Sequence, residues 1–208
     1  MAKRPVNNFK SRTFKEKVLI LCEGLTEKNY FNAMKEDLGL PKTIAVEITD
    51  CKGDVTDVLK NAKKDGVKKI FVVFDHDNFP KRSDVFKLAS QKNANVIFSS
   101  ICFEIWYLLH FKNSTKAFNS EAELEKKLKK CIGMENYEKN NFKHYSILKD
   151  KLATAKSHAE SIRLSVVENN YGVEVFNLNP YTNVDELVCF SVGSFSTLGF
   201  VLNIDALL

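Results

Sequence analysis

The sequence lacks the patterns that mark several large classes of protein. Its five cysteines, at positions 22, 51, 102, 131 and 189, form no Cys-x-x-Cys pair and show no zinc-finger spacing. Cys22 and Cys102 lie within strongly apolar runs, so we expect buried thiols in a reducing cytosol rather than disulfides. Repeated and low-complexity segments are also missing. These absences favour one compact cytoplasmic unit.

Apolar runs of the kind found in membrane spans and secretory signals are missing too. The charged residues at the N-terminus are followed by no apolar h-region, so we expect no secretory signal. The only long, mostly uncharged run covers residues 189–208, and its serines, glycines, Asn203 and Asp205 disfavour a membrane span. The sequence therefore predicts a cytoplasmic location and no membrane partner.

With 208 residues, 44% of them hydrophobic, the chain can bury one substantial core with a smaller helical part attached. Four parts are predicted: a basic flexible arm over residues 1–17, an α/β core over 18–112, a helical extension packed on the core over 113–190, and an unassigned tail over 191–208. The arm includes Lys10, Arg12 and Lys15, which are candidates for contacts with nucleic-acid phosphates; a solvated tail is the alternative.

Residues 18–30, VLILCEGLTEKNY, predict a buried strand that leads into a helix through a tight turn. The apolar, β-branched-rich run ends before Glu23, and helical spacing resumes after Gly24, with Thr26 as the expected N-cap. Glu23 then ends the strand and Glu27 lies in the first helical turn. In an open α/β sheet, ligands bind at this edge.

Strands and helices alternate along the first half of the chain. Further strands are expected over residues 44–48, 69–74 and 95–99, with helices over 54–62 and 83–91. This alternation predicts an α/β fold: a Rossmann-like parallel sheet of about four strands, flanked by helices. A helical C-terminal part should follow, with helices over residues 121–130 and 144–168 and a last helix that begins near Pro180 with Thr182 as its cap.

Four carboxylates should converge on one edge of the sheet if the first and third strands are neighbours: Glu23, Glu27, Asp75 and Asp77. Like charges this close repel one another unless a cation lies among them. Oxygen ligands suit Mg²⁺ or Mn²⁺, and the lack of a nearby Cys or second His disfavours zinc. The alternative is that the acids cap helices, which suits Glu27 and Asp77 better than the two acids that directly end buried strands.

Glu104 is a fifth candidate. It lies in the apolar run FEIWYLLHF of residues 103–111, where an ionised carboxylate needs a partner or a role. The alternative is an exposed face of an otherwise buried helix. His110 in the same run is interpreted as a core residue.

Three blocks of the sequence resemble the RloB-like family. Residues 23–31 are similar to its E-G-x-T-E-x-x-Y-F opening, residues 100–111 to its S-x-x-C-F-E-x-W-x-L-L-H-F block, and residues 179–188 to its N-P-x-T-x-V-x-x-L-V. Their order and spacing cover the chain from about residue 18 to 188. Ser100-Ile101 depart from the pattern, since the family usually has Asn-Pro there.

The resemblance implies a TOPRIM core, in which Glu23 is the glutamate after the first strand and Asp75 and Asp77 form the D-x-D after the third. Glu27 resembles the second acid of the nuclease branch. The implied function is Mg²⁺- or Mn²⁺-dependent cleavage of a nucleic-acid phosphodiester in bacterial anti-phage defence by abortive infection. The substrate is DNA or RNA, tRNA included, and a partner ATPase or another defence-system protein is a further candidate partner.

Roles follow for each candidate. We expect Glu23, Asp75 and Asp77 to hold one cation, and Glu27 with Glu104 a second. Lys139, in a segment that resembles the family's Y-x-K-N, is the candidate to meet transition-state charge; a solvated lysine is the alternative. From another functional class, a non-catalytic module that binds a nucleotide or partner at this edge, as a sensor or effector subunit, remains open.

Overall fold

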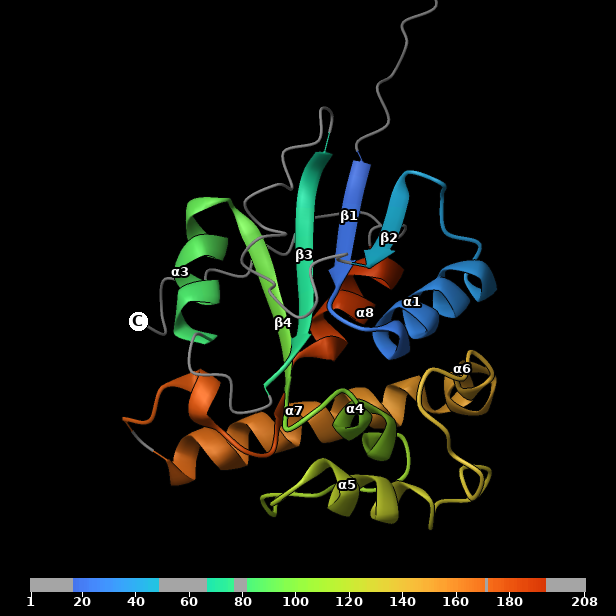
Figure 1. Cartoon of the computed structure of the whole chain (residues 1–208), viewed down its shortest axis with the longest axis vertical. Helices are drawn as coiled ribbons and strands as arrows, with labels where there is room; N and C mark the ends of the chain where they lie inside the picture. Colours follow the sequence, from blue (N-terminus) through green and yellow to red (C-terminus); the bar gives the residue numbers. More distant parts are fainter. Residues whose placement is uncertain (1–16, 49–66, 77–81, 171, 194–208) are drawn as a thin grey trace, which may run out of the picture.

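The computed structural model describes residues 17–48, 67–76, 82–170 and 172–193. At its centre lies a five-stranded sheet of order β2-β1-β3-β4-β5 (Figure 1). The strands are β1 (Lys17–Cys22), β2 (Ile44–Ile48), β3 (Val67–Asp75), β4 (Ala94–Ser100) and β5 (Tyr181–Thr182). The first four are parallel, and β5 pairs antiparallel with β4. The predicted α/β fold is confirmed, and the sheet has one strand more than expected.

β5 corrects the prediction for the last helix. The last helix was expected to begin near Pro180 with Thr182 as its cap. Thr182 instead pairs with Ser99 of β4, and α8 (Val184–Gly193) begins two residues later, where the N–H of Val184 donates a 3.4 Å hydrogen bond to the Thr182 hydroxyl. The hydroxyls of Thr182 and Ser99 lie 2.9 Å apart in the core. A strand of two residues is too short to show a period in the sequence.

β1 is the strand that positions the acidic edge. Its last four residues are all buried, as a central parallel strand covered on both faces requires. It pairs with β2 on one side and β3 on the other, and Cys22 lies opposite Val73 of β3. The first and third strands therefore end side by side, which was the condition for the predicted carboxylate cluster.

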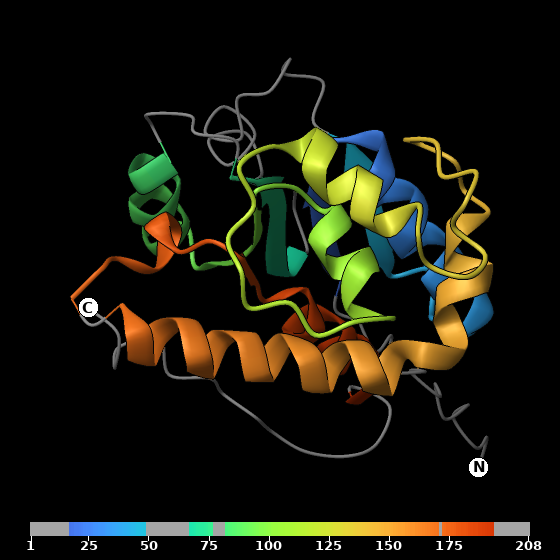
Figure 2. The ribbon, with the colours of Figure 1, turned by 90° about the horizontal axis from the view of Figure 1, so that it is seen from below.

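The helices surround this sheet. α1 (Leu25–Asp37) packs against β1 and β2, and α3 (Arg82–Gln91) and α8 pack against β4. A helical layer lies beyond the carboxyl ends of the parallel strands (Figures 1 and 2). It contains α4 (Glu104–Leu109), α5 (Glu121–Leu128), α6 (His144–Leu148) and α7 (Leu152–Asn169). The site described below lies between the strand ends and this layer.

The long helix predicted in the C-terminal part is interrupted in the structure. The single helix expected over residues 144–168 is divided, because a 3-10 turn, η1 (Lys149–Lys151), separates α6 from α7. A second 3-10 turn, η2 (Val175–Asn177), precedes β5. The helix expected over residues 54–62 lies outside the described residues.

One continuous hydrophobic core includes residues of the sheet and of the helical layer. It joins strand residues such as Ile20 and Phe98 to the fully buried Trp106 of α4 and to Leu148 and Ala159. Cys22, Cys102 and Cys131 are buried free thiols, as predicted, whereas Cys189 is a free thiol that is only partly buried. Across the described ranges, no helix has both the length and the apolar character needed to cross a bilayer.

Candidate metal centre

The turn between β1 and α1 supplies two carboxylates. Glu23 directly follows the strand, and Gly24 in extended conformation is the N-cap residue of α1. A Cβ atom added to Gly24 would lie 2.7 Å from Oε2 of Glu27, so the missing side chain makes room for this carboxylate. Thr26, predicted as the N-cap, lies instead within the first turn, where its hydroxyl bonds to Asn140.

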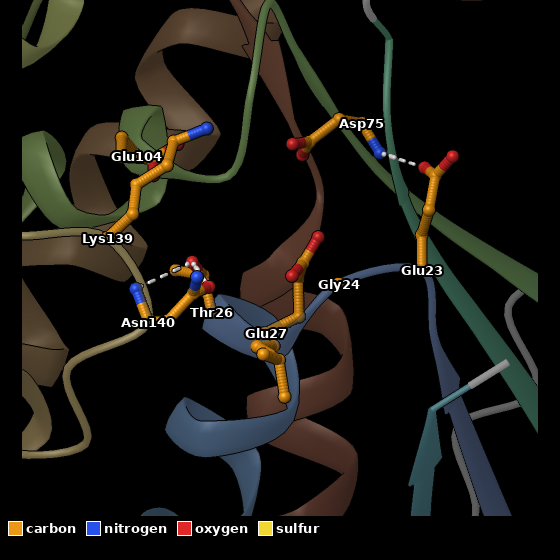
Figure 3. A pocket seen from close by; sticks show the side chains of 9 residues that line it. Glu23, Gly24, Thr26, Glu27, Asp75, Glu104, Lys139 and Asn140 are labelled. Atoms are coloured by element: carbon orange, nitrogen blue, oxygen red, sulfur yellow. Dashed lines mark hydrogen bonds between the residues drawn. The ribbon is translucent and has the colours of Figure 1, made fainter. Parts of the chain in front are cut away.

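Asp75 ends β3 beside this turn. Its backbone N–H donates a 3.1 Å hydrogen bond to Oε2 of Glu23, so the ends of the two strands are joined through a carboxylate (Figure 3). Oδ1 of Asp75 is buried and has no hydrogen-bond partner among the described residues. Asp77, the second aspartate of the predicted pair, lies outside the described residues, as do Lys10, Arg12 and Lys15 of the basic arm.

Glu104 begins α4 on the opposite side of the pocket. Its side chain is 1% exposed, and Oε1 accepts a 2.5 Å hydrogen bond from the hydroxyl of Tyr137. The alternative that Glu104 marks an exposed helix face is therefore wrong. His110, four residues after Trp106, is buried and bonds to the Trp106 carbonyl, in agreement with its interpretation as a core residue.

Lys139 and Asn140 complete the wall that faces Glu27. The ammonium of Lys139 forms an ion pair with Glu121 of α5, and both side chains are about half exposed. Oδ1 of Asn140 accepts a 3.1 Å hydrogen bond from Thr26, and its carbonyl accepts a 2.6 Å bond from Asn29. Lys139 thus lines the pocket, and its ammonium is paired with an acid.

These residues enclose one pocket of about 350 Å³. Four of its nine lining residues are acids, and they come from the turn after β1, from α1, from the end of β3 and from α4. The full lining is Glu23, Gly24, Leu25, Thr26, Glu27, Asp75, Glu104, Lys139 and Asn140. Figure 3 shows Glu27 and Asp75 directed into the space between the strand ends and Lys139. Every described carboxylate that was predicted to bind metal is therefore in this pocket.

The comparisons with known proteins agree with the sequence blocks. The family model described as RloB-like protein matches residues 18–190, which is most of the chain. The chain belongs to the RloB-like family. No curated protein and no solved structure matches it.

The acids of this RloB-like protein perturb one another. Burial, followed by the charges of Glu27, Glu104 and Glu23, raises the pKa of Asp75 well above its usual range. Burial is also the main cause that raises the pKa of Glu27 to about 7, with contributions from Glu104 and Glu23. Lys139 opposes both shifts but does not cancel them. Without a bound cation, the protonated forms of these two carboxyls are therefore favoured.

A divalent cation fits this RloB-like pocket. The converging groups are carboxylate oxygens, the ligands that Mg²⁺ and Mn²⁺ prefer, and the unpartnered Oδ1 of Asp75 lies among them. Glu23 and Asp75 approach from the strand ends, while Glu27 and Glu104 approach from two helices. Among the described residues, the three potential ligands whose atoms lie within 4.8 Å of one another are Cys102, Glu104 and Glu121, so the other acids of the pocket would have to move closer together to share a cation.

Three features of the site were missed by the sequence analysis. Glu121 was interpreted only as part of a charged helix, yet its carboxylate lies within 4.8 Å of ligand atoms of Cys102 and Glu104. The expectation that no cysteine lies near the acids was wrong for this part of the site, because Cys102 is separated from Glu104 by one residue and is buried beside it. The contact between Asn140 and Thr26 had no local signal, since 114 residues separate them.

Proposed function

We propose that this RloB-like protein is a nuclease that hydrolyses a nucleic-acid phosphodiester with Mg²⁺ or Mn²⁺. One observation carries the proposal: four carboxylates from two strand ends and two helices surround one pocket, and the buried Oδ1 of Asp75 has no partner among the described residues. Such an arrangement costs free energy in the absence of a cation. Membership of the family and the TOPRIM-like order of the acids support the same assignment.

In this proposal, Glu23 and Asp75 hold one cation, with Asp77 as a further ligand, and Glu27 and Glu104 hold a second. Divalent cations bound there supply Lewis-acid activation of the phosphodiester and a hydroxide nucleophile at neutral pH. The chain's own residues orient the ligands: the bond from Asp75 N–H holds Glu23, and Gly24 leaves space for the carboxylate of Glu27. Rigid strand ends suit this task because they limit ligand motion.

Lys139 has a separate role in the proposed reaction. Its ammonium is close enough to the acids to lower the pKa of Glu27 and of Asp75. When a phosphodiester enters the pocket, this ammonium stabilises the negative charge that develops on the phosphate oxygens. The half-exposed side chain of Lys139 can leave Glu121 and move to the phosphate.

The biological setting is the second part of the proposal. We place the activity in bacterial anti-phage defence by abortive infection, in the cytoplasm, with DNA or RNA as substrate and with a partner ATPase or defence-system protein as a candidate regulator. The support for this setting is the family membership alone.

The test is a cleavage panel. Purified protein is incubated with a tRNA pool, a supercoiled plasmid and single-stranded DNA and RNA, with Mg²⁺, with Mn²⁺ or with a chelator. Cleavage of at least one substrate that needs the metal and is lost in Asp75→Asn supports the proposal. Glu36→Gln, which removes an exposed acid of α1 outside the pocket, is the matched control. Metal-dependent binding of a nucleotide or partner without cleavage supports the binding-module alternative instead.

A further inference from the structure

Tyr137 fixes one of the two helix-borne acids. Its side chain is 2% exposed, and its ring packs against those of Tyr107 and His144, with centroid distances of 6.2 and 4.6 Å. From this position its hydroxyl donates the 2.5 Å hydrogen bond to Oε1 of Glu104. A buried side chain held by ring contacts has few alternative rotamers, so the bond sets the orientation of the carboxylate.

Asn140 fixes the turn that carries the other acid. Its backbone has φ of 65°, in the left-handed region that asparagine tolerates better than most residues. In this conformation its N–H donates to Oγ1 of Thr26 at 3.4 Å, its Oδ1 accepts from the same hydroxyl at 3.1 Å, and its carbonyl accepts from Asn29 at 2.6 Å. Thr26 and Asn29 flank Glu27 in α1, so these bonds hold the first turn that presents Glu27.

Residues 137–140 thus bond to α4 at one end and to α1 at the other. Glu104 and Glu27 are far apart in the sequence, and both line the same pocket. Between the two anchors, Lys139 pairs with Glu121 of α5 and keeps the segment against the helical layer. The segment therefore spans the gap between the two elements whose acids must act together.

We propose that Tyr137 and Asn140 are positioning residues that hold Glu104 and Glu27 as one cation-binding pair. The inference rests on the proposed function, because it assigns a supporting shell to the second cation of that site. Hydrogen bonds to ligand carboxylates from outside the coordination sphere orient the ligands, and their loss commonly weakens metal binding about 10–100-fold. Neither residue touches the reacting atoms in this account.

The variants are chosen to remove a few defined bonds each. Tyr137→Phe deletes only the hydroxyl that serves Glu104, and Asn140→Gly deletes the side-chain bond to Thr26 while permitting the positive φ and keeping the backbone bonds. Thr26→Val, a nearly isosteric change, removes both bonds between Thr26 and Asn140 from the α1 side. The matched control is Tyr145→Phe, since Tyr145 is also buried but its hydroxyl faces Asp37 at the far end of α1.

Mn²⁺ binding is measured by titration calorimetry well below the melting temperature, and melting of the metal-free proteins is recorded in parallel. We expect Tyr137→Phe to weaken Mn²⁺ binding by about tenfold or more, and Tyr145→Phe to bind as the wild type does. Asn140→Gly keeps its backbone bonds to Thr26 and Asn29, so it should weaken binding by more than about twofold but less than Tyr137→Phe does. The double variant Thr26→Val/Asn140→Gly should bind no more weakly than Thr26→Val alone, because Thr26→Val already removes the bond that Asn140→Gly removes.

The outcomes separate this inference from the proposed function. If the wild type binds Mn²⁺ and both Tyr137→Phe and Asn140→Gly bind it within about twofold of wild type, the segment has a structural role only and the inference is wrong. A wild type that binds no Mn²⁺ overturns the proposed function and the inference with it. If Tyr137→Phe does not fold, the Asn140→Gly and Thr26→Val titrations decide alone.

Discussion

The backbone N–H of Asp75 donates a 3.1 Å hydrogen bond to the carboxylate of Glu23. The bond connects the ends of two adjacent parallel strands, and it places two acids side by side at the edge where α/β sheets bind ligands. Each acid directly follows four buried strand residues: residues 19–22 of β1 precede Glu23, and residues 71–74 of β3 precede Asp75. The pair is therefore rigid before any ligand arrives.

Divalent metal should stabilise the fold through this pair. At a Mn²⁺ concentration about 100 times the Kd, mass action predicts a rise in Tm of roughly 5–10 °C for a chain of this size. Asp75→Asn should abolish most of this rise and raise the Tm of the metal-free protein, because it removes one of the repelling charges. Differential scanning fluorimetry measures both, with the exposed Asp150→Asn as control. A Tm that changes with neither Mn²⁺ nor Mg²⁺ would contradict the metal assignment.

The metal-free protein should lose stability as the pH rises. The folded-state pKa of Glu27 is raised from 4.5 to about 7, mainly by burial, and that of Asp75 is raised as well. A raised carboxyl pKa means that the folded state binds protons more tightly than the unfolded state does. This contribution is present below pH 4.5 and is lost as the pH rises through about 7.

Melting of the metal-free protein between pH 5 and pH 8 measures this loss. A decrease of about 1 kcal/mol in the free energy of unfolding lowers the Tm by roughly 2–4 °C. Glu27→Gln should flatten the pH dependence, since the amide does not titrate. An equally steep dependence in Glu27→Gln would show that other groups cause it.

Gly24→Ala should separate cation affinity from stability. The new Cβ would lie 2.7 Å from Oε2 of Glu27, so the carboxylate must move, while the flexible side chain can do so at small cost to the fold. We expect weaker Mn²⁺ binding with a nearly unchanged Tm. Gly39→Ala is the converse control, because Gly39 has φ of 60° with open space around it: this variant should lower Tm and leave Mn²⁺ binding intact. Unchanged calorimetry for Gly24→Ala would contradict the placement of Glu27.

Much of the acidic edge was predictable because buried strands leave a clear signal. The apolar runs of β1 and β3 stop at Glu23 and Asp75, and the parallel fold then requires their side chains to meet. The wall opposite was not predictable in the same way. The bonds from Tyr137 to Glu104 and from Asn140 to Thr26 join residues 33 and 114 positions apart, in a segment without secondary structure, so no local period marks them.

Two residues predicted as helix caps, Thr26 and Thr182, contact distant segments of the chain. Thr26 has the residue type of an N-cap, but its hydroxyl bonds to Asn140 and Gly24 takes the capping position. The hydroxyl of Thr182 serves two contacts, because it lies 2.9 Å from the Ser99 hydroxyl inside the sheet and also accepts a hydrogen bond from the N–H of Val184 at the start of α8. At Thr26 a contact with a distant segment thus prevails over local propensity, and at Thr182 such a contact adds to it.

The basic N-terminal arm should contribute to nucleic-acid affinity without setting sequence preference. Deletion of residues 1–12, or replacement of Lys10, Arg12 and Lys15 by Gln, removes positive charges that can displace counterions from phosphates. The slope of log K against log salt concentration should become shallower by about 0.9 for each lost contact to duplex DNA. Fluorescence anisotropy over a salt series measures this slope. If both variants keep the wild-type slope, the arm is a solvated tail.

The central claim is that Glu23 holds a catalytic cation, and cleavage by Glu23→Gln tests it most directly. The Gln side chain has nearly the volume of Glu, and its amide oxygen can still accept the hydrogen bond from the N–H of Asp75. The neutral amide is, however, a poorer ligand for a hard cation. With the substrate found in the cleavage panel, we predict circular dichroism and metal-free Tm near wild type and a cleavage rate lower by a factor of about 100 or more, with Glu36→Gln unaffected. A folded Glu23→Gln protein that cleaves at the wild-type rate in Mg²⁺ would contradict the account.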